Sequence, residues 1–353
     1  MILFKKNAAA FLRIGLLIFI TFFGLSCSDK ITDSTIAVDN QKLDEAFLQA
    51  QQIQNLKSLV VFHSGKIIKE AFYRDGGAES PHDVRSVTKS VIGLLIGIAI
   101  EKGFIPSVDQ TIGTYLSPLV QNLSTEKANI KISHLLTMSS GFDWYELGGV
   151  GYNEWITSNN QVEFVLDKAI VSQPGQLFNY NSGALHLLSV IISRASGMST
   201  LNFAKQYLFV PLDIDDRTWS TDKQGLYNGS AGLKITPHDM VKIGQLILNG
   251  GAYNGKRIVS SQWIEKIIIS KITTNSTMPF ASGYSYCWWT DQNSKGSYTF
   301  ANGYGGQFIF VVPNLKLVVV ATNQWSGVES SVANDQWYRT MDLIISQVLS
   351  AFD

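Results

Sequence analysis

The sequence predicts an α/β fold combined with an all-α part: a central antiparallel sheet formed by both ends of the chain, flanked by helices, with a helical insertion. Runs rich in Val, Ile and Phe stand near both ends, at 58–73 and 284–322. Helical patterns and long loops fill the stretch between them. An uncharged segment marks one helix as buried. We therefore expect a discontinuous sheet domain at 46–102 and 235–353, interrupted by a helical insertion domain at 103–234.

The first predicted elements are a short helix and a hairpin. Apolar residues recur at helical spacing over 46–56. Two β-rich runs follow at 58–62 and 67–73, and the glycine-containing turn between them is typical of a β-hairpin. The polar stretch that precedes these elements, at 27–45, is expected to be a tether.

A core helix follows this hairpin. Positions 91–100 carry no charge and are apolar on every face, which predicts a helix buried on all sides. The segment is too short to cross a bilayer, which needs about 20 such residues. Ser86 and Lys89 stand at the polar beginning of this helix.

Turn and cap signals place the remaining elements. Gly141 ends a short helix that begins near 131, and a helix through Leu185 and Leu188 ends at Gly197. Thr236 and Pro237 are an N-cap and a first helical residue, so another helix begins there. Strands are expected at 284–290, 297–300, 307–312 and 315–322, the last two as a hairpin, before a final amphipathic helix at 332–350.

Ser86 and Lys89 have the spacing of a serine nucleophile and its base. Residues i and i+3 share one face of a helix, so the amine can lie beside the hydroxyl. Ser124–Lys127 and Ser220–Lys223 have the same spacing, but they lie in polar, loop-like sequence where a lysine is solvated and charged. Lys89 alone is followed by Ile, Leu and Val residues that can desolvate the amine and lower its pKa. The alternative is a helix that begins with an ordinary capping serine.

Composition excludes several classes of function. The 353 residues are 45% hydrophobic and 16% charged, with a formal net charge of zero, and the mature part has no basic run, which argues against a nucleic-acid partner. The five histidines (63, 82, 134, 186 and 238) show neither HExxH nor HxH spacing, and no CxxC pair occurs, so no metal site is indicated. The GxSxG motif of α/β-hydrolases does not occur either.

The N-terminus has the pattern of a secretory signal over residues 1–26. Lys5, Lys6 and Arg13 precede an apolar run that ends at small residues before Cys27. This arrangement resembles a bacterial lipobox, in which Cys27 becomes the lipidated first residue, although Gly24 stands where leucine is usual. We expect an exported protein of the bacterial periplasm or outer membrane, anchored by lipid. Plain cleavage and a retained anchor are the alternatives.

Removal of residues 1–26 would change the charge and the cysteine count. It takes away three positive charges and leaves 25 basic against 28 acidic residues, so the mature protein is mildly acidic. If Cys27 is lipidated, Cys287 is left alone. An intramolecular disulfide is then impossible, and stability must come from the core.

Three separated segments together resemble the penicillin-recognising serine hydrolases, the family of class C β-lactamases, DD-peptidases and related esterases and amide hydrolases. They are Ser86-x-x-Lys89, Tyr180-x-Ser182 and Ala301-Asn302-Gly303-Tyr304-Gly305-Gly306-Gln307. The resemblance covers most of the mature chain and implies a β-lactamase/transpeptidase-like fold. Several motifs in the right order are more specific than one.

The resemblance implies a role for each of these residues. Ser86 would be the acylated nucleophile, activated by a neutral Lys89, and Tyr180 a proton shuttle whose phenol has its pKa lowered by the nearby lysine. The backbone N–H groups of Ser86 and Tyr304 would form the oxyanion hole. Ser182 would donate a hydrogen bond to the Lys89–Tyr180 pair or to the substrate.

Further residues are expected to contact the substrate. Gly303, Gly305 and Gly306 would let a strand edge approach it closely, and Asn302, directly before Gly303, is a further candidate contact. An aromatic and glycine-rich patch is expected at the lip of the cleft, with a simple packed loop as the alternative. Its candidate substrate-binding side chains are Trp144, Tyr152 and Trp155.

Two departures from the family pattern bear on the substrate. The chain has Tyr180-Asn181-Ser182 where β-lactamases show Tyr-x-Asn, and Ala301-Asn302-Gly303 where they show Lys-Thr-Gly. The second change removes the cation that grips a substrate carboxylate. Both changes disfavour β-lactam and D-Ala-D-Ala substrates, and the pattern is similar to the 6-aminohexanoate-dimer hydrolase branch.

The sequence therefore predicts a cell-envelope serine hydrolase that cleaves an amide or ester bond of a small-molecule, peptide or ester substrate through an acyl-enzyme, without cofactor or metal. One alternative is a β-lactamase or DD-peptidase. Another is a catalytically silent envelope protein of the same fold that binds peptides or peptidoglycan fragments. The oligomeric state is left open.

Overall fold

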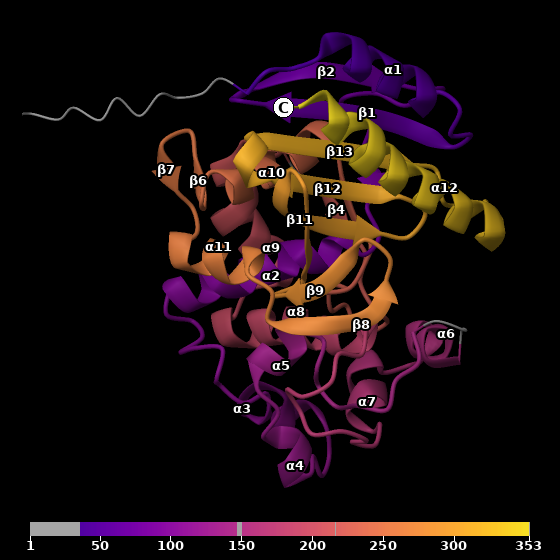
Figure 1. Cartoon of the computed structure of the whole chain (residues 1–353). Helices are drawn as coiled ribbons and strands as arrows, with labels where there is room; N and C mark the ends of the chain where they lie inside the picture. The colour runs from indigo at the N-terminus through magenta and orange to yellow at the C-terminus, as the bar shows by residue number, and fades with distance from the viewer. Residues whose placement is uncertain (1–35, 147–149, 216, 353) are drawn as a thin grey trace, which may run out of the picture. The chain divides into compact units, whose positions relative to one another are not determined.

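The computed structural model describes residues 36–146, 150–215 and 217–352, and residues 36–353 form one compact unit (Figure 1). The predicted signal segment 1–26, Cys27 and most of the tether lie outside the described residues.

An eight-stranded antiparallel sheet organises this unit. One terminal hairpin, β1 and β2, joins the rest of the sheet because β1 pairs with β13, with Val60 opposite Val320. Both ends of the chain therefore build one sheet, which confirms the predicted fold class. The strands, in spatial order, are β2 (Lys66–Phe72), β1 (Leu56–His63), β13 (Leu317–Asn323), β12 (Gln307–Val312), β11 (Gly296–Gly303), β10 (Trp288–Asn293), β9 (Ala281–Ser285) and β8 (Ile272–Met278).

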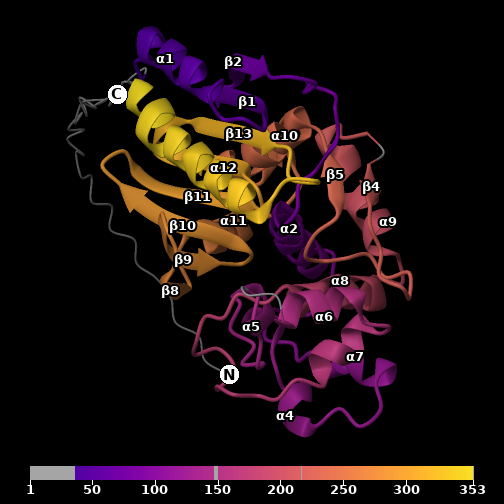
Figure 2. The same cartoon turned by 90° about the vertical axis from the view of Figure 1, so that its right-hand side faces the viewer.

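Helices cover both faces of the sheet, which explains why every residue of β1, β12 and β13 is buried. On one face lie α1 (Asn40–Ala50) and α12 (Ser330–Asp342), with the π and 3-10 turns at 343–351 that extend α12 (Figure 2). The opposite face carries the helices α10 (Pro237–Leu248), α2 (Val87–Glu101) and α11 (Ser261–Ile268). Neighbouring residues of β12 show the alternation: Phe308 packs on Trp337 of α12, whereas Ile309 lies against Gly244 of α10.

The predicted core helix is α2. All its residues from Val87 to Ala99 are buried. Two glycines are required by its neighbours: a Cβ on Gly97 would lie 2.5 Å from the Trp263 ring, and one on Gly93 would lie 2.5 Å from the Tyr286 carbonyl oxygen. Trp263 of α11 and the turn at Tyr286 thus pack directly against the backbone of α2. These contacts fix the position of the helix in the fold.

Two sequence-based boundaries were wrong. The first helix spans Asn40–Ala50 rather than 46–56, because Asp39 accepts a hydrogen bond from the Lys42 N–H and begins the helix inside the predicted tether. The predicted strand 284–290 is instead two strands, since Tyr286 and Cys287 adopt φ values of 41° and 71° and form the turn between β9 and β10. The edge strand β8 was not predicted.

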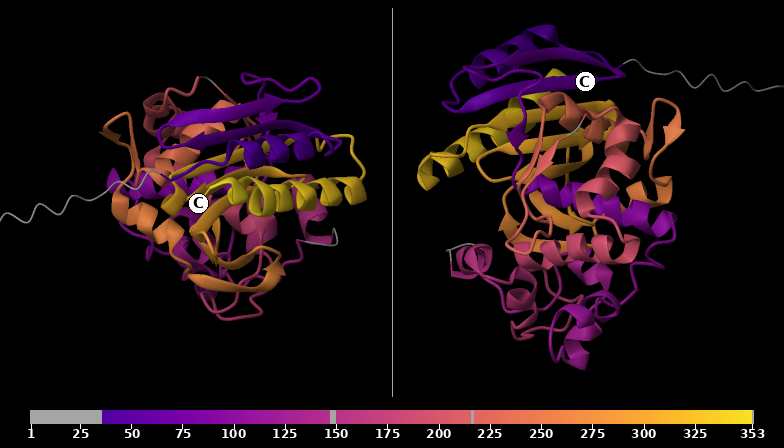
Figure 3. Two further views of the ribbon diagram at one scale, coloured as in Figure 1. Left: turned by 45° about the horizontal axis from the view of Figure 1, so that its top comes forward. Right: turned by 180° about the vertical axis from the view of Figure 1, so that it is seen from behind.

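Short helices make up most of the predicted insertion, and Figure 3 shows them gathered at one end of the sheet layer. A small sheet of β3 (His82–Asp83), β5 (Leu233–Ile235) and β4 (Thr218–Trp219) adds strands to this region, so it is not wholly helical. The boundaries at 103 and 234 stay a prediction. The helices are α3 (Gly113–Leu116), α4 (Thr125–Ala128), α5 (Ile132–Leu136), α6 (Val150–Thr157), α7 (Gln161–Leu166), α8 (Ser182–Ser196) and α9 (Thr200–Ala204), with π and 3-10 turns at 205–212.

In the part of the chain that the structure describes, no single helix is long and apolar enough to cross a membrane; one pair bent by 78°, α8 with the segment 200–212, passes that test only when both are counted together.

Candidate active site

Ser86 and Lys89 lie together at the N-terminal end of α2. Ser86 directly precedes the helix and is half-buried, whereas Lys89 in the first turn is only 2% exposed. The Lys89 Nζ lies 2.7 Å from the Ser86 Oγ and 3.0 Å from the carbonyl oxygen of Ser230. The structure therefore places a buried amine within hydrogen-bonding distance of a partly accessible hydroxyl.

Burial changes the charge of this amine. Desolvation lowers the pKa of Lys89 to about 7; the negative charge of Glu146 opposes this shift and the positive charge of Arg85 adds to it. A large fraction of Lys89 is therefore neutral near pH 7 and can accept the proton of the Ser86 hydroxyl.

The two other Ser-x-x-Lys pairs do not share this arrangement. The amine of Lys127 donates to the carbonyl of Leu166 at 2.6 Å, and that of Lys223 donates to the carbonyl of Thr157 at 2.7 Å. Ser124 instead caps α4. All three pairs have the same spacing in the sequence. In the structure, the lysine amine contacts the serine hydroxyl in the Ser86–Lys89 pair.

Tyr180 completes the group from the segment before α8. The Lys89 Nζ lies 5.0 Å from the centroid of the Tyr180 ring, and this ring stacks on Trp289 at 5.7 Å. Burial raises the pKa of the Tyr180 phenol, as does the charge of Glu146; a hydrogen bond with Ser86 acts in the opposite direction without cancelling them. The predicted lowering of this pKa by lysine was wrong, because desolvation of the buried phenol is the largest effect on it. The phenol is protonated and can donate.

Glu146 is a site residue that sequence reasoning missed. Its Oε2 accepts hydrogen bonds from the Ser182 N–H at 3.0 Å and from the Trp144 Nε1 at 2.6 Å, and its Oε1 accepts a hydrogen bond from the Ser182 hydroxyl. Its charge also acts on both Lys89 and Tyr180. The one signal in the sequence is a carboxylate inside the aromatic and glycine-rich patch.

The role expected of Ser182 is corrected by these contacts. Its side chain is fully buried and donates to Glu146, not to the Lys89–Tyr180 pair. Ser182 is also the first residue of α8, and Asn181 before it caps the helix by accepting from the Ala184 N–H. Ser182 therefore ties Glu146 to the beginning of α8, directly after Tyr180.

The end of β11 meets the chain just before Ser86. A Cβ on Gly303 would lie 2.4 Å from the Val84 carbonyl oxygen, so only glycine fits there. Tyr304 follows and is 38% exposed. The N–H groups of Ser86 and Tyr304 donate to no oxygen, nitrogen or sulfur of the described residues. Two free amide donors on adjoining segments are what an oxyanion hole requires.

Two predicted substrate contacts in this strand end are not supported. Asn302 lies on the opposite face of β11 from Gly303, because side chains alternate along a strand, and its Oδ1 accepts from Trp337 Nε1 of α12 at 2.6 Å. Gly305 is buried, and a Cβ there would lie 2.7 Å from Trp325. Both residues support the turn around Tyr304 from behind.

The aromatic patch is mostly core. Trp155 is fully buried and Trp144 is 3% exposed, so neither lines the lip of a cleft, and their rings pack edge to face at 6.0 Å. Tyr152 is half-buried, and its hydroxyl accepts a hydrogen bond from Arg85 Nη2 at 3.3 Å. Of the three predicted lip residues, only Tyr152 therefore lies beside the Ser86 segment.

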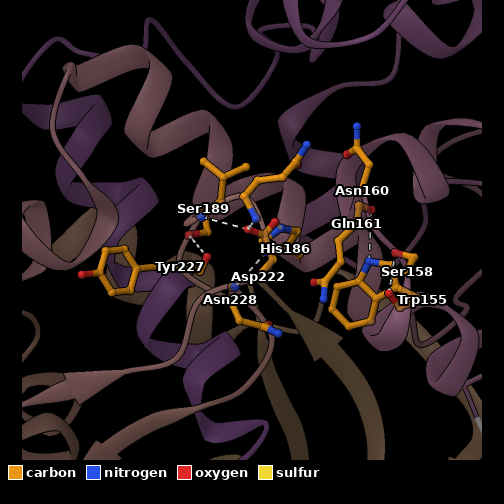
Figure 4. Close-up of polar contacts among 12 residues, drawn as sticks. Trp155, Ser158, Asn160, Gln161, His186, Ser189, Asp222, Tyr227 and Asn228 are labelled. Atoms are coloured by element: carbon orange, nitrogen blue, oxygen red, sulfur yellow. Dashed lines mark hydrogen bonds and ion pairs between the residues drawn. The ribbon is translucent and has the colours of Figure 1, made fainter.

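A buried polar network supports the Ser230 carbonyl that contacts Lys89. His186 Nε2 lies 3.2 Å from Asp222 Oδ2, and both side chains are almost fully buried (Figure 4). The Asn228 Oδ1 accepts from the N–H and the hydroxyl of Ser230, each at 2.8 Å. Desolvation acts to raise the pKa of Asp222, but the hydrogen bonds from His186 and from the N–H groups of Leu226 and Gln224 together outweigh it, so this pKa is lowered. The network holds the loop 222–230 against α8.

Within the described ranges, no group of three or more His, Cys, Asp or Glu side chains is arranged to hold a metal ion. Cys287 is a free, buried thiol, and Cys27 lies outside those ranges.

Comparisons with known proteins agree with this geometry. Residues 41–339 match the beta-lactamase family. The chain is 24% identical over 318 residues to the 6-aminohexanoate-dimer hydrolase of Paenarthrobacter ureafaciens, a match that covers 84% of this chain and 78% of that protein.

Solved structures share the fold. The octameric penicillin-binding protein homologue from Pyrococcus abyssi superimposes with a TM-score of 0.67 at 20% identity, covering 87% of this chain and 77% of that one. EstCE1, a hydrolase with promiscuous acyltransferase activity, gives a TM-score of 0.67 at 17% identity and covers 85% and 99%. Because the family match spans most of the sequence, the chain belongs to the beta-lactamase family of serine hydrolases.

Proposed function

We propose that this protein cleaves an amide or ester bond through an acyl-enzyme formed on Ser86. The observation that carries the proposal is the 2.7 Å contact between the Ser86 hydroxyl and the buried amine of Lys89. A serine hydroxyl is a weak nucleophile at neutral pH, and an adjacent neutral base activates it. The lowered pKa of Lys89, about 7, supplies that base.

The first half of the reaction follows from these positions. The neutral amine of Lys89 takes the Ser86 proton while the Ser86 Oγ bonds to the substrate carbonyl carbon. The N–H groups of Ser86 and Tyr304 stabilise the negative charge that develops on the carbonyl oxygen. When the bond to the leaving group breaks, the protonated phenol of Tyr180 gives its proton to that group and regains one from the Lys89 ammonium. The products are an ester on Ser86 and a free amine or alcohol.

The second half reverses these proton transfers. Water attacks the Ser86 ester and gives a proton to the neutral amine of Lys89. The same amide donors stabilise the second tetrahedral intermediate. Collapse releases the carboxylic acid and returns a proton to the Ser86 Oγ, so both side chains end in their starting states.

Amides and esters other than β-lactams are the proposed substrates. Ala301 offers no cation at the strand position where the family's β-lactamases have lysine, and it is fully buried. The 24% identity to a 6-aminohexanoate-dimer hydrolase supports a linear amide as the bond that is cleaved.

The test compares three forms of the purified protein on p-nitrophenyl acetate, p-nitrophenyl butyrate, linear amides and nitrocefin. Ser86→Ala should abolish hydrolysis of esters and amides, whereas Ser124→Ala, the matched serine of another Ser-x-x-Lys pair, should behave as wild type. Equal activity of Ser86→Ala and wild type would overturn the proposal. Turnover of nitrocefin with an efficiency above that of the esters would replace it with a β-lactamase.

We also propose that the protein works in the cell envelope. The support is the N-terminal pattern of basic residues, apolar run and Cys27. Fractionation and metabolic labelling with a fatty-acid analogue test this in a bacterial host. The native chain should be labelled and sediment with membranes, and Cys27→Ser should not be labelled. Label retained by Cys27→Ser would contradict a lipid anchor at this residue.

A further inference from the structure

Arg85, the residue before Ser86, is held at the edge of the site by its side-chain contacts. Its guanidinium lies 4.2 Å from the centroid of a Trp325 ring, and its Nη2 donates to the Tyr152 hydroxyl at 3.3 Å. The side chain is 21% exposed. An arginine stacked on a tryptophan in this way is oriented and still charged.

The backbone at this position is also fixed. Arg85 has a φ of 49°, in the left-handed region that costs free energy for a residue other than glycine. Asp83 Oδ1 accepts from the Arg85 N–H at 2.9 Å, and the Asp83 carbonyl accepts from Trp325 Nε1 at 3.0 Å. Asp83 thus fixes the turn through the Arg85 N–H. It also fixes the Trp325 ring, against which the guanidinium packs.

The guanidinium is incompletely hydrogen-bonded. Arginine carries five N–H donors. Among the described residues its Nε is buried without a hydrogen-bond partner. The Asp83 carboxylate forms an ion pair with the guanidinium, with Oδ2 3.9 Å from Nη1, which is too far for a hydrogen bond. The hydrogen bond to Tyr152 leaves most of the donors unused. N–H donors of the guanidinium are therefore available for an anion, while Asp83 balances part of its charge.

This cation belongs to the residue next to the nucleophile. Adjacent Cα atoms are about 3.8 Å apart, so Arg85 and the nucleophile Ser86 share one turn. The charge of Arg85 contributes to the lowered pKa of Lys89. The position that holds a carboxylate-binding lysine in β-lactamases is Ala301 here. Arg85 thus places a cation on the Ser86 side of the site.

We propose that Arg85 binds a carboxylate of the substrate from the Ser86 side of the site and not from the position of Ala301, where β-lactamases bind theirs, so that the preferred substrates are open-chain amides or esters that carry a carboxylate a few atoms from the scissile carbonyl. This inference rests on the proposed hydrolase function, because it assumes that a substrate binds beside Ser86. A planar guanidinium and a carboxylate form paired, charge-assisted hydrogen bonds, and stacking on Trp325 reduces the entropy lost when they form.

The experiment measures binding to the full-length Ser86→Ala protein, so that no turnover is required. Three amides of similar size are compared by calorimetry: N-propylsuccinamate with a carboxylate on the acyl side, N-butanoyl-β-alanine with one on the amine side, and neutral N-propylbutanamide. At least one anionic amide should bind tenfold or more tightly than the neutral one. A second substitution, Arg85→Gln, should remove this preference, and Arg85→Lys should restore part of it.

The control substitution is Lys256→Gln, which removes one exposed positive charge from β7 (Lys256–Arg257), outside the Ser86 segment. It should leave the anionic preference unchanged. Equal binding of all three amides, or a preference that survives Arg85→Gln, would overturn the role of Arg85. Circular dichroism of each variant confirms that it is folded.

The two proposals fail separately. Covalent labelling of the wild-type protein by a fluorophosphonate tests the nucleophile, and its absence would overturn the hydrolase function while the binding comparison still decides the role of Arg85. In turnover assays the ratio of kcat/KM for p-nitrophenyl hemisuccinate to that for p-nitrophenyl butyrate should fall about tenfold in Arg85→Gln. This ratio cancels any effect of Arg85 on Lys89, which both esters share.

Discussion

The side-chain nitrogen of Lys89 is buried at the bottom of α2's first turn and lies 2.7 Å from the Ser86 hydroxyl oxygen. Lys89 is only 2% exposed, and this withdrawal from water disfavours its charged form. Burial of the amine costs free energy of folding, and it also lowers the pKa of Lys89 so that the amine can act as a base near neutral pH.

The first prediction concerns pH. The neutral form of Lys89 is the base, so kcat/KM for p-nitrophenyl butyrate should rise with pH and level off above an apparent pKa of about 7. A stopped-flow or plate assay from pH 5 to 9 measures this limb. A rate that already reaches its plateau at pH 5 would show that the base is a different group.

The second prediction links activity to stability. Lys89→Met should remove ester hydrolysis by roughly four orders of magnitude, about as much as Ser86→Ala, because nucleophile and base act as a unit. The folded-state pKa of Lys89 is depressed from 10.5 to about 7, so between these values the unfolded chain binds more protons and the wild type gains stability as pH rises.

Urea unfolding of both forms measures the consequence for stability. Lys89→Met should raise the free energy of unfolding by about 1–4 kcal/mol at pH 7, with a smaller gain at pH 10. A variant that is less stable than wild type by the same amount at both pH values would contradict the burial of an ionisable amine.

The third prediction tests Glu146 as a positioning residue. In Glu146→Gln one acceptor oxygen becomes a donor facing Ser182 or Trp144, which should cost about 1–3 kcal/mol of stability and lower kcat about tenfold. Loss of the negative charge also lowers the pKa of Lys89, so the acid limb of the pH profile should move to lower pH. Glu154→Gln, an exposed glutamate in α6, should change none of the three quantities. A limb that does not move would leave Glu146 with a structural role alone.

The fourth prediction concerns the buried pair behind the site. Asp222→Ala leaves His186 buried without its partner and should lower the free energy of unfolding by about 1–3 kcal/mol. Because the folded-state pKa of Asp222 is depressed, the wild-type advantage should be present above pH 4 and be lost as pH falls below the unfolded value of 3.8. Asp335→Ala, which removes an exposed partner of Arg339, is the control. Equal unfolding curves for the Asp222 and Asp335 variants would contradict the network.

Much of the fold could be predicted from local patterns. The absence of charge over 91–100 predicted α2, and the β-rich runs at both ends predicted a sheet that joins them. The turn at Tyr286 and Cys287 could not be predicted, because neither residue favours positive φ. Tertiary contacts hold it: the Ser90 hydroxyl donates to the Cys287 carbonyl at 2.7 Å, and the Cys287 N–H donates to Leu136.

The site was predicted in the same uneven way. Motif spacing identified Ser86, Lys89 and Tyr180, which the structure brings together. The face of β11 on which Asn302 lies depends on the register of the strand. The burial of Trp155 depends on packing across three helices. Glu146 is separated from Ser182 by 36 positions in the sequence, so their hydrogen bond has no local signature.

Mass spectrometry of the fluorophosphonate-labelled protein tests the central claim most directly. We expect one adduct per chain, on the peptide that contains Ser86, with a labelling rate that rises through pH 7 and is lost in Lys89→Met. An adduct on any other serine, or equal labelling of the wild type and Lys89→Met, would contradict the activation of Ser86 by a buried neutral lysine.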